Sequence, residues 1–327
     1  MKQYHHNSYR VRIVLAGVLL TLLIGMPGAF VGAAEVLFVP DDYPTIQEAV
    51  DAANPNGGDT ISVAPGEYAG AVILKSVTII GSGNETKITS GTWLYDEDAF
   101  DIGYVNETEI RNLMIEGDDL LWGFWLYMAH NVTIANVTVN NPYLGIEAIF
   151  SDGLTISDST FNNSYRAIDI RNGSDCEVMH NRAFGLKAKP KTWGLVSHAL
   201  GIFLSDTNDC VVAHNSVRHI GDAVGGYDEE SYVGIALASL GLPTEGNNFH
   251  HNRVEVSINW DEAPPSEIES SYAHVVIDYG VDWYGLPISI KNNKLMHNNY
   301  QGSDQGVLYY PPEVADYNFA KFNLFDE

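Results

Sequence analysis

The segment IRNLMI at residues 110–115 returns in altered form along most of the chain, and this repetition decides the fold. The first copies are about 23 residues apart, a period typical of solenoid proteins. They read IANVTV at 134–139, ISDSTF at 156–161 and MHNRAF at 179–184, followed by AHNSV at 213–217, HHNRV at 250–254 and IKNNKL at 290–295. One polar position recurs in all of them: Asn112, Asn136, Asp158, Asn181, Asn215, Asn252 and Asn293.

A second short element follows each copy. It reads GFWL at 123–126, GIEA at 145–148, AIDI at 167–170, GIFL at 201–204 and GIAL at 234–237, with looser versions at 274–277 and 306–309. Turn residues separate these β-rich runs, and no amphipathic helix lies between them. Stacking such coils about 4.8 Å apart pairs the strands and buries a continuous apolar interior. The recurring Asn suits a left-handed bend, and its amide can bond to the Asn above and below.

An antiparallel sandwich would also contain short strands. It does not explain a fixed polar position with a constant downstream element, so the repeats predict an all-β parallel solenoid. Before the repeats, the sequence reads VPDDYPTIQEAVDAA at 39–53 and GDTISVAPGEY at 58–68. Thr45 and Glu48 form a capping-box pattern at the start of a short predicted helix. We expect this helix to cover the open strand edges at the N-terminal end of the solenoid.

The helix segment and the repeats together resemble the pectin-lyase-like right-handed parallel β-helix superfamily. They are most similar to the repeat region shared by carbohydrate-binding proteins, sugar hydrolases and NosD-type periplasmic proteins. The resemblance implies a right-handed single-stranded parallel β-helix with an N-terminal capping helix over nearly all of residues 35–327. It is specific for the fold and not for the function, because this fold hosts lyases, hydrolases, esterases, adhesins and structural proteins.

The first 34 residues have the features of a secretion signal. Lys2, Arg10 and Arg12 precede an apolar run at 13–26, and a Pro-Gly pair and small residues follow. A retained membrane anchor is the alternative, but the run is short for a spanning helix. We therefore expect residues 1–34 to be a signal peptide and the protein to be secreted or displayed on the cell surface. Six glycosylation sequons begin at Asn84, Asn106, Asn131, Asn136, Asn162 and Asn172.

The chain is strongly acidic, with a formal net charge of −25. Such a surface repels nucleic acid and anionic lipid, and it favours cations. No organic cofactor is indicated, whereas a divalent cation such as calcium is compatible with this charge. We expect no nucleic-acid partner, and contact with a membrane only if the N-terminal segment is retained.

Within the single predicted domain, residues 35–70 form the cap and first coil, and residues 105–310 form the stacked repeats. The repeat is interrupted at one corner of three successive coils, where long loops are expected at 185–200, 219–233 and 254–273. Stacking must bring these loops together as a lobe, and insertions on one face of a solenoid often form its binding face. Aromatic rings beside carboxylates suit sugar binding, which makes six residues candidates: Trp193, Tyr227, Tyr232, Trp260, Asp261 and Tyr272. A packed subdomain or a protein contact surface is the alternative.

Carboxylates in neighbouring coils are candidates for acid/base catalysis. Glu147 and Asp169 occupy the same position of their elements, so they should stack about 5 Å apart, near the separation in retaining glycosidases. Arg171 could instead neutralise Asp169, and Asp206 in the turn after the next strand is equally ambiguous. The Gly-His-Gly of polygalacturonases and the Asp-Pro-His-Glu of mannuronan epimerases are absent. Activity as a polysaccharide lyase or a glycoside hydrolase therefore stays open.

Three histidines, His180, His214 and His251, each precede a recurring Asn and should form a column outside one bend. Imidazoles at this spacing could share a transition metal, and the resemblance to NosD-type proteins implies a link to copper. The alternative is that His is an ordinary repeat residue. Cys176 and Cys210 each lie five residues before the recurring Asn, so they should be neighbours, either as a disulfide or as a thiol pair.

These observations favour a secreted or cell-surface protein that binds polysaccharide or a cell-surface glycan through the three-loop lobe and could also cleave it. A structural sheath or surface-layer subunit, which would self-associate, is the first alternative. A NosD-like metal-handling protein is the second.

Overall fold

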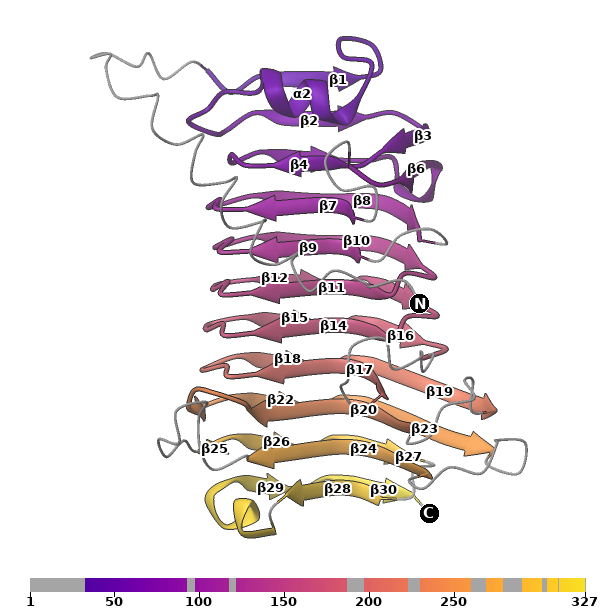
Figure 1. Ribbon diagram of the computed structural model, residues 1–327, viewed down its shortest axis with the longest axis vertical. Coiled ribbons are helices and arrows are strands. Elements are labelled where there is room, and N and C mark those ends of the chain that lie inside the picture. Colours follow the sequence, from indigo (N-terminus) through magenta and orange to yellow (C-terminus); the bar gives the residue numbers. More distant parts are fainter. Residues whose placement is uncertain are drawn as a thin grey trace, which may run out of the picture. The chain divides into compact units, whose positions relative to one another are not determined.

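The computed structural model describes residues 33–92, 98–117, 122–186, 197–222, 230–259, 269–278, 290–301, 305–310 and 312–326. Within these residues the strands pair in parallel from coil to coil, and Figure 1 shows the coils of residues 34–327 stacked along one axis. The predicted parallel β-helix is confirmed. The strands form a 19-stranded sheet, here called sheet A, a nine-stranded sheet, here called sheet B, and a short two-stranded pair.

Sheet B holds one strand from each coil. Its strands are β4 (Ala71–Ile73), β7 (Asp98–Gly103), β9 (Trp122–Tyr127), β11 (Leu144–Ile149), β14 (Arg166–Arg171), β17 (Ser197–Ser205), β20 (Glu230–Ser239), β24 (Glu269–Asp278) and β28 (Gln305–Tyr310). They lie side by side in this order.

Sheet A turns a corner, so that most coils contribute two segments to it. Its first strands are β1 (Val36–Val39), β2 (Thr60–Val63), β3 (Gly66–Ala69), β5 (Thr78–Ile80), β6 (Thr86–Ser90), β8 (Glu109–Glu116) and β10 (Thr133–Asn140). The later ones are β12 (Thr155–Ser157), β13 (Thr160–Asn162), β15 (Glu177–Met179), β16 (Arg182–Phe184), β18 (Val211–Ala213), β19 (Ser216–Asp222), β22 (Asn248–His250), β23 (Arg253–Asn259), β26 (Lys294–Met296), β27 (Asn299–Gln301), β29 (Phe319–Lys321) and β30 (Leu324–Asp326). The two-stranded pair is β21 (Thr244–Glu245) and β25 (Ile290–Lys291), and the 3₁₀ turns are η2 (Gly83–Glu85) and η4 (Pro312–Tyr317).

The interior is built from columns of equivalent apolar residues. Ile110 pairs with Ile134, and the column continues through Ile156 and Val178 in the next coils. All four side chains are at most 1% exposed. Each such side chain contributes about 1.5–3 kcal/mol when it is removed from water, and the column gains this in every coil. The alternation of apolar and polar residues in the repeat therefore sets which side of each strand faces inward.

A ladder of buried asparagines runs beside the apolar columns in the C-terminal half. Asn215 donates from Nδ2 to Val178 O (2.8 Å) and to Asn252 Oδ1 (3.0 Å). Asn252 repeats the pattern with Val212 O and Asn298 Oδ1. Each amide thus satisfies its own polar atoms and the backbone of the coil before it, which buried polar groups require.

The polar position aligned from the sequence corresponds to three different columns in the structure, so the sequence alignment is wrong here. The register pairs Asn136 with Asp158, and Asp158 in turn with His180, because Ser157 pairs with Met179. Asn112, Asn136 and Asp158 therefore lie outside the bend, with φ between 50° and 59°. Asn181 lies one position further on, inside the bend, where the earlier coils have Leu113 and Val137.

Asn293 is also misplaced by the alignment. It bonds to Asn247 and Asn318 in a second buried ladder, in which the Asn247 and Asn293 backbone amides each donate to the next side chain. The residue of the first ladder in this coil is Asn298, which accepts hydrogen bonds from Asn252. Asn can serve both in a left-handed bend and as a buried amide, so its identity alone does not separate these positions.

The predicted capping helix is present as α2 (Ile46–Ala52). Thr45 is its N-cap and accepts a hydrogen bond from the Glu48 backbone N–H at 3.2 Å. Ile46, Ala49 and Val50 are buried against the first coil, whose strands β1 and β2 contact α2. No helix among the described residues combines the length and the apolar character needed to cross a membrane. Residues 1–32, which hold most of the predicted signal peptide, lie outside the described residues.

The coils that carry the predicted long loops have longer strands. β20 and β24 each span 10 residues, against six in β9, β11 and β14. On sheet A, β19 and β23 remain paired out to Asp222 and Asn259, and Figure 1 shows both extending beyond the strands of the preceding coils. The bases of the predicted loops therefore adjoin one another, whereas most residues of the loops lie outside the described residues.

Candidate functional site

The outer face of sheet B brings together charged and aromatic residues. In β9, β11 and β14 the side chains of Phe124, Ile146 and Ile168 point into the core. The residues that follow them, Trp125, Glu147 and Asp169, are partners in register. Because side chains alternate along a strand, this second row faces outward. The structure thus places Glu147 and Asp169 side by side, at the positions expected from the sequence.

Two arginines enclose the carboxylate of Asp169. Arg171 donates from Nε to Oδ1 (2.9 Å) and from Nη2 to Oδ2 (2.6 Å), and Arg166 also donates to Oδ2. Arg171 Nη2 lies 3.3 Å from Glu147 Oε1, and Trp122 donates its indole N–H to Glu147 Oε2 at 2.6 Å. We call Glu147, Arg166, Asp169 and Arg171 the ion-pair cluster.

The surroundings drive the pKa values of the two carboxyls apart. Burial raises the pKa of Glu147, and this outweighs the opposing effect of Arg171. Burial alone would also raise the pKa of Asp169, but Arg171 and Arg166 together bring it below its ordinary value. The cluster therefore holds Asp169 as a carboxylate and makes Glu147 easier to protonate.

The cluster is closed to a substrate. Asp169 is fully buried and Glu147 is 4% exposed. The oxygens of Asp169 are engaged by arginine, and those of Glu147 by Arg171 and Trp122. A nucleophile or a general base must reach the substrate. We therefore assign the cluster a positioning role: it fixes Trp122 and joins the two strands.

Asp206 belongs to a turn. Its Oδ1 accepts hydrogen bonds from the backbone N–H groups of Leu240, Gly241 and Leu242 at 2.8, 3.0 and 2.9 Å. Three amide donors on one oxygen hold the loop of the next coil against the end of β17. This geometry gives Asp206 a turn-stabilising role.

An exposed aromatic group adjoins the cluster, and we call it the aromatic strip: Tyr104, Trp125, Tyr127 and Phe150. The rings of Trp125 and Tyr127 are parallel, with centroids 5.6 Å apart and 1° between their planes. Tyr104 and Phe150 meet the Tyr127 ring edge-on, at 5.7 and 6.0 Å. Tyr104 is 52% exposed and Phe150 44% exposed, which leaves much of the strip open to solvent.

Two residues of the strip occupy positions that do not suit aromatic residues. Tyr104 and Phe150 have φ values of 56° and 54° at the corner after β7 and β11. In the next two coils Asn172 and Asp206, residues that tolerate this conformation better, occupy the same corner. An exposed bulky side chain in a left-handed bend costs stability without gaining burial, and such strain often marks a functional surface.

The strip is not among the residues predicted from the sequence, although one feature of the repeat pointed to it. Trp125 is the third residue of the element GFWL, which is the position that Glu147 and Asp169 hold in their elements. The prediction considered only the carboxylates of that row and therefore omitted its aromatic member. Tyr104, Tyr127 and Phe150 lie outside the recurring elements, and a sequence without three-dimensional register gives no sign that they meet.

Most of the sugar-binding residues predicted on the loops are not described. Trp193, Tyr227, Trp260 and Asp261 lie outside the described residues. Of the other two, the backbone alone is described: Tyr232 is in β20 and pairs with Ser271, and Tyr272 is in β24 and pairs with Val233. The two tyrosines thus lie in neighbouring strands, offset by one residue.

The histidine column is present on sheet A. His180, His214 and His251 stack with ring centroids 5.1 and 5.0 Å apart. The column continues to His297, 5.2 Å beyond His251, which the misplaced Asn293 concealed in the sequence. His250 lies beside it, and its Nδ1 is 2.9 Å from Nδ1 of His251.

Cys176 and Cys210 are register neighbours, as expected, and both are buried free thiols, which is the thiol-pair alternative. A hydrogen bond that the Cys210 thiol donates to Cys176, together with burial, raises the pKa of Cys210. Among the sequons, Asn84, Asn106, Asn131 and Asn136 are exposed, while Asn162 and Asn172 are half-buried.

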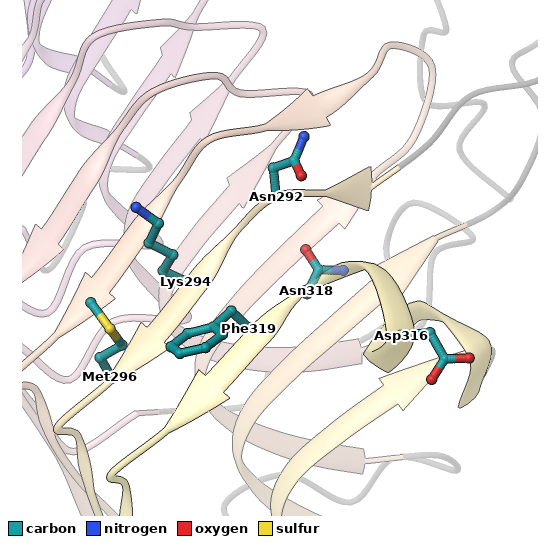
Figure 2. Close-up of a pocket in the computed structure, with 6 residues that line it drawn as sticks. All are labelled: Asn292, Lys294, Met296, Asp316, Asn318 and Phe319. Carbon is teal, nitrogen blue, oxygen red and sulfur yellow. The ribbon is translucent and has the colours of Figure 1, made fainter.

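Figure 2 shows a pocket at the C-terminal end of sheet A, lined by Asn292, Lys294, Met296, Asp316, Asn318 and Phe319. Asn318 belongs to the second buried ladder, and its Oδ1 accepts from the Asn293 side chain at 2.9 Å. Asp316 is the one carboxylate in this lining. Phe319 is the one ring in this lining, whereas four rings adjoin the carboxylates on sheet B.

Residues 99–255 match the family model for the right handed beta helix region, a range that includes the strip and the cluster. No curated protein matches the chain. Among solved structures, it is similar to the catalytic domain of a GH87 alpha-1,3-glucanase in complex with tetrasaccharides (12% identity, 92% of this chain and 71% of that chain, TM-score 0.47). It is also similar to an alginate lyase from Paenibacillus sp. str. FPU-7 (14%, 89% and 99%, 0.43) and to the A-module of Azotobacter vinelandii mannuronan C-5 epimerase (16%, 88% and 94%, 0.38).

These similarities to polysaccharide-active β-helix enzymes are distant. At such identities and TM-scores no substrate or catalytic residue can be transferred, so the function has to follow from the residues of this chain.

Proposed function

The chain contains a right-handed β-helix region, and we propose that it is a secreted or cell-surface protein that binds polysaccharide on the outer face of sheet B. The aromatic strip is the contact surface in this proposal. The observation that carries it is the ring group of Tyr104, Trp125, Tyr127 and Phe150, in which Tyr104 and Phe150 are exposed and stand on strained backbone. Aromatic rings bind the apolar faces of sugar rings while the hydroxyl groups stay hydrated or find polar partners.

The ion-pair cluster supports binding from beneath. Trp122 is held by Glu147, and Glu147 pairs in register with Trp125 of the strip. A rigid ring costs less entropy to immobilise on binding than a mobile one, so fixing the strand beneath the strip favours affinity. The buried carboxylates have no catalytic role in this proposal, which concerns binding alone.

The three-loop lobe extends this surface in our proposal. Its basal strands β17, β20 and β24 continue sheet B directly from β14. A long polysaccharide lying across the strands could therefore contact both the strip and the loops that carry Trp193 and Trp260. The net charge of −25 favours neutral chains over polyanionic ones.

A panel of neutral, uronic-acid and sulfated polysaccharides tests the proposal by affinity electrophoresis of the purified protein. We expect at least one neutral polysaccharide to retard the wild type, and Trp125→Ala to migrate as it does without polysaccharide. Phe322→Asn is the matched control, because Phe322 is an exposed aromatic residue in a left-handed bend on sheet A. If no polysaccharide of the panel retards the wild type, the proposal of polysaccharide binding is wrong. Ordered polymers of the purified protein would favour a structural envelope role.

A further inference from the structure

A row of histidines follows the corner of sheet A, where each coil turns between its two segments. His214 lies between β18 and β19, and His251 lies between β22 and β23. Both have left-handed backbone, with φ of 57° and 55°, and each is followed by a buried Asn of the ladder. The ladder fixes the backbone here, so the imidazoles project from a rigid frame.

His250 departs from the column. It is the last residue of β22, and its partner in the preceding coil is Ala213. Alanine leaves room above the strand, and the His250 ring stands at 90° to the rings of both His214 and His251, with centroids 5.7 and 5.2 Å away. The three imidazoles therefore form a group around one position, unlike the parallel rings of a simple stack.

We propose that His214, His250 and His251 bind one divalent transition-metal ion. One ring nitrogen from each residue lies within 4.8 Å of the other two. Nδ1 of His250 and Nδ1 of His251 are 2.9 Å apart. With metal–nitrogen bonds of about 2.0 Å, two nitrogens at this distance subtend about 90°, the angle between adjacent ligands in tetragonal Cu(II) or Ni(II) sites.

The third ligand needs a small adjustment. His214 and His251 are exposed and His250 is half-buried, so a side-chain rotation that brings a His214 nitrogen closer to the other two meets little resistance. Water can fill the remaining positions because the site faces solvent. The site differs from the column His180, His214 and His251 considered from the sequence, since collinear rings cannot converge on one ion.

Imidazole ligands suit Cu(II), Ni(II) and Zn(II), and affinity for a given nitrogen site follows the order Zn(II) or Ni(II) below Cu(II). The net charge of −25 raises the local concentration of cations. Met296 is the register partner of His250 on its other side and offers a nearby thioether. These features favour copper as the ion held most tightly.

Copper titration of the tag-free full chain tests the site, with glycine as a competing chelator and calorimetry and Cu(II) electron paramagnetic resonance as readouts. His250→Ala reproduces Ala213 of the preceding coil, and His214→Asn reproduces Asn136 of the same column, so both changes keep a residue that the fold already accepts. His297→Asn is the matched control in the same column, outside the three-histidine site. His5 and His6 are present in every variant and cancel in the comparison.

We expect the wild type to bind copper with nitrogen hyperfine structure in its spectrum. His250→Ala and His214→Asn should each lose one equivalent or weaken it at least tenfold, while His297→Asn stays within twofold. Equal binding by the wild type and His250→Ala would overturn the proposal. Loss in His297→Asn as large as in His250→Ala would also overturn it, because the ion would then be held by the column as a whole.

Discussion

Asn252 accepts two hydrogen bonds from Asn215, one from the backbone N–H and one from Nδ2, each across 3.0 Å. The same pair of bonds joins Asn181 to Asn215 and Asn252 to Asn298. Each side-chain oxygen therefore accepts one bond from the neighbouring side chain and one from the neighbouring backbone N–H, which at the bend has no backbone carbonyl as its partner among the described residues. The ladder therefore fixes the register of sheet A, and with it the histidine row.

Replacing Asn252 should destabilise the protein strongly. Asn252→Ala leaves the Asn215 backbone N–H, the Asn215 amide and the Val212 carbonyl without this partner in a dry interior. We expect a loss of about 2–4 kcal/mol in the free energy of unfolding, measured by urea denaturation. Asn136→Gly is the control, since Asn136 is exposed, has a φ of 50° that glycine accepts, and makes one bond to Asn112. Equal losses in the two variants would contradict a special role of the buried ladder.

Asp169 should stabilise the protein in a pH-dependent way. Its pKa is below the ordinary value in the folded state because Arg171 and Arg166 outweigh the effect of burial. Its carboxylate therefore adds stability above the unfolded pKa of about 4, and this stability is lost as the pH falls through the folded value. Asp169→Asn should cost about 3–5 kcal/mol at pH 7, because two buried arginine contacts are left without their charge partner. The difference from the wild type should shrink at pH 3, and a constant difference would be the contrary result.

The charge of Glu147 should have the opposite effect on the pH dependence of stability. Burial raises its pKa in the folded state, so folding disfavours the ionised form above the unfolded pKa of about 4.3. Glu147→Gln keeps the shape and removes the charge, and Arg171 retains Asp169. At pH 7 we expect the variant to be at least as stable as the wild type. Lowering the pH should stabilise the wild type relative to the variant. A large loss of stability in Glu147→Gln at pH 7 would show that the ion pair with Arg171 dominates.

The two cysteines should react only after unfolding. Cys176 and Cys210 are both fully buried, and the pKa of Cys210 is raised by the hydrogen bond that it donates to Cys176 and by burial. Thiol titration with a chromogenic disulfide should give no fast reaction in the native protein and two thiols in guanidinium under non-reducing conditions. Detection of no thiols in guanidinium would mean that the pair is oxidised.

The architecture was predictable because every coil repeats the same apolar pattern. Ile110, Ile134 and Ile156 could be aligned without a structure, and they do pair. The capping helix was predictable for a local reason: the Thr45 hydroxyl and the apolar face beginning at Ile46 lie within a few residues of each other.

The register was less predictable, since asparagine performs two tasks in this chain. Aligning Asn136 with Asn181 shifted the later coils by one residue, whereas the structure aligns Val137 with Ser159 and Ser159 with Asn181. That shift hid His297 and assigned Asn293 to the wrong ladder. In a coiled chain a shift of one residue moves a side chain from the outside to the core, and composition alone does not report it.

The candidate site was predictable only in part, because it is formed by contacts between coils. Glu147 and Asp169 were paired correctly, but their burial under two arginines follows from the packing of Phe203 and Tyr165 around Arg166, at 5.1 and 5.4 Å. The sequence gives residue types and spacings, and it does not report which outward row is covered. The aromatic strip was missed for the same reason.

Isothermal titration of one retarding polysaccharide into Phe150→Asn and Phe322→Asn tests polysaccharide binding by the strip most directly. Both changes remove an exposed aromatic side chain from a left-handed bend and introduce a residue that other coils carry at that bend, Asn172 and Asn136 respectively. Because one aromatic contact is worth about 0.5–1.5 kcal/mol beyond its buried area, Phe150→Asn should weaken binding about three- to tenfold or more, and Phe322→Asn should match the wild type. Equal affinity of all three proteins would contradict binding at the strip.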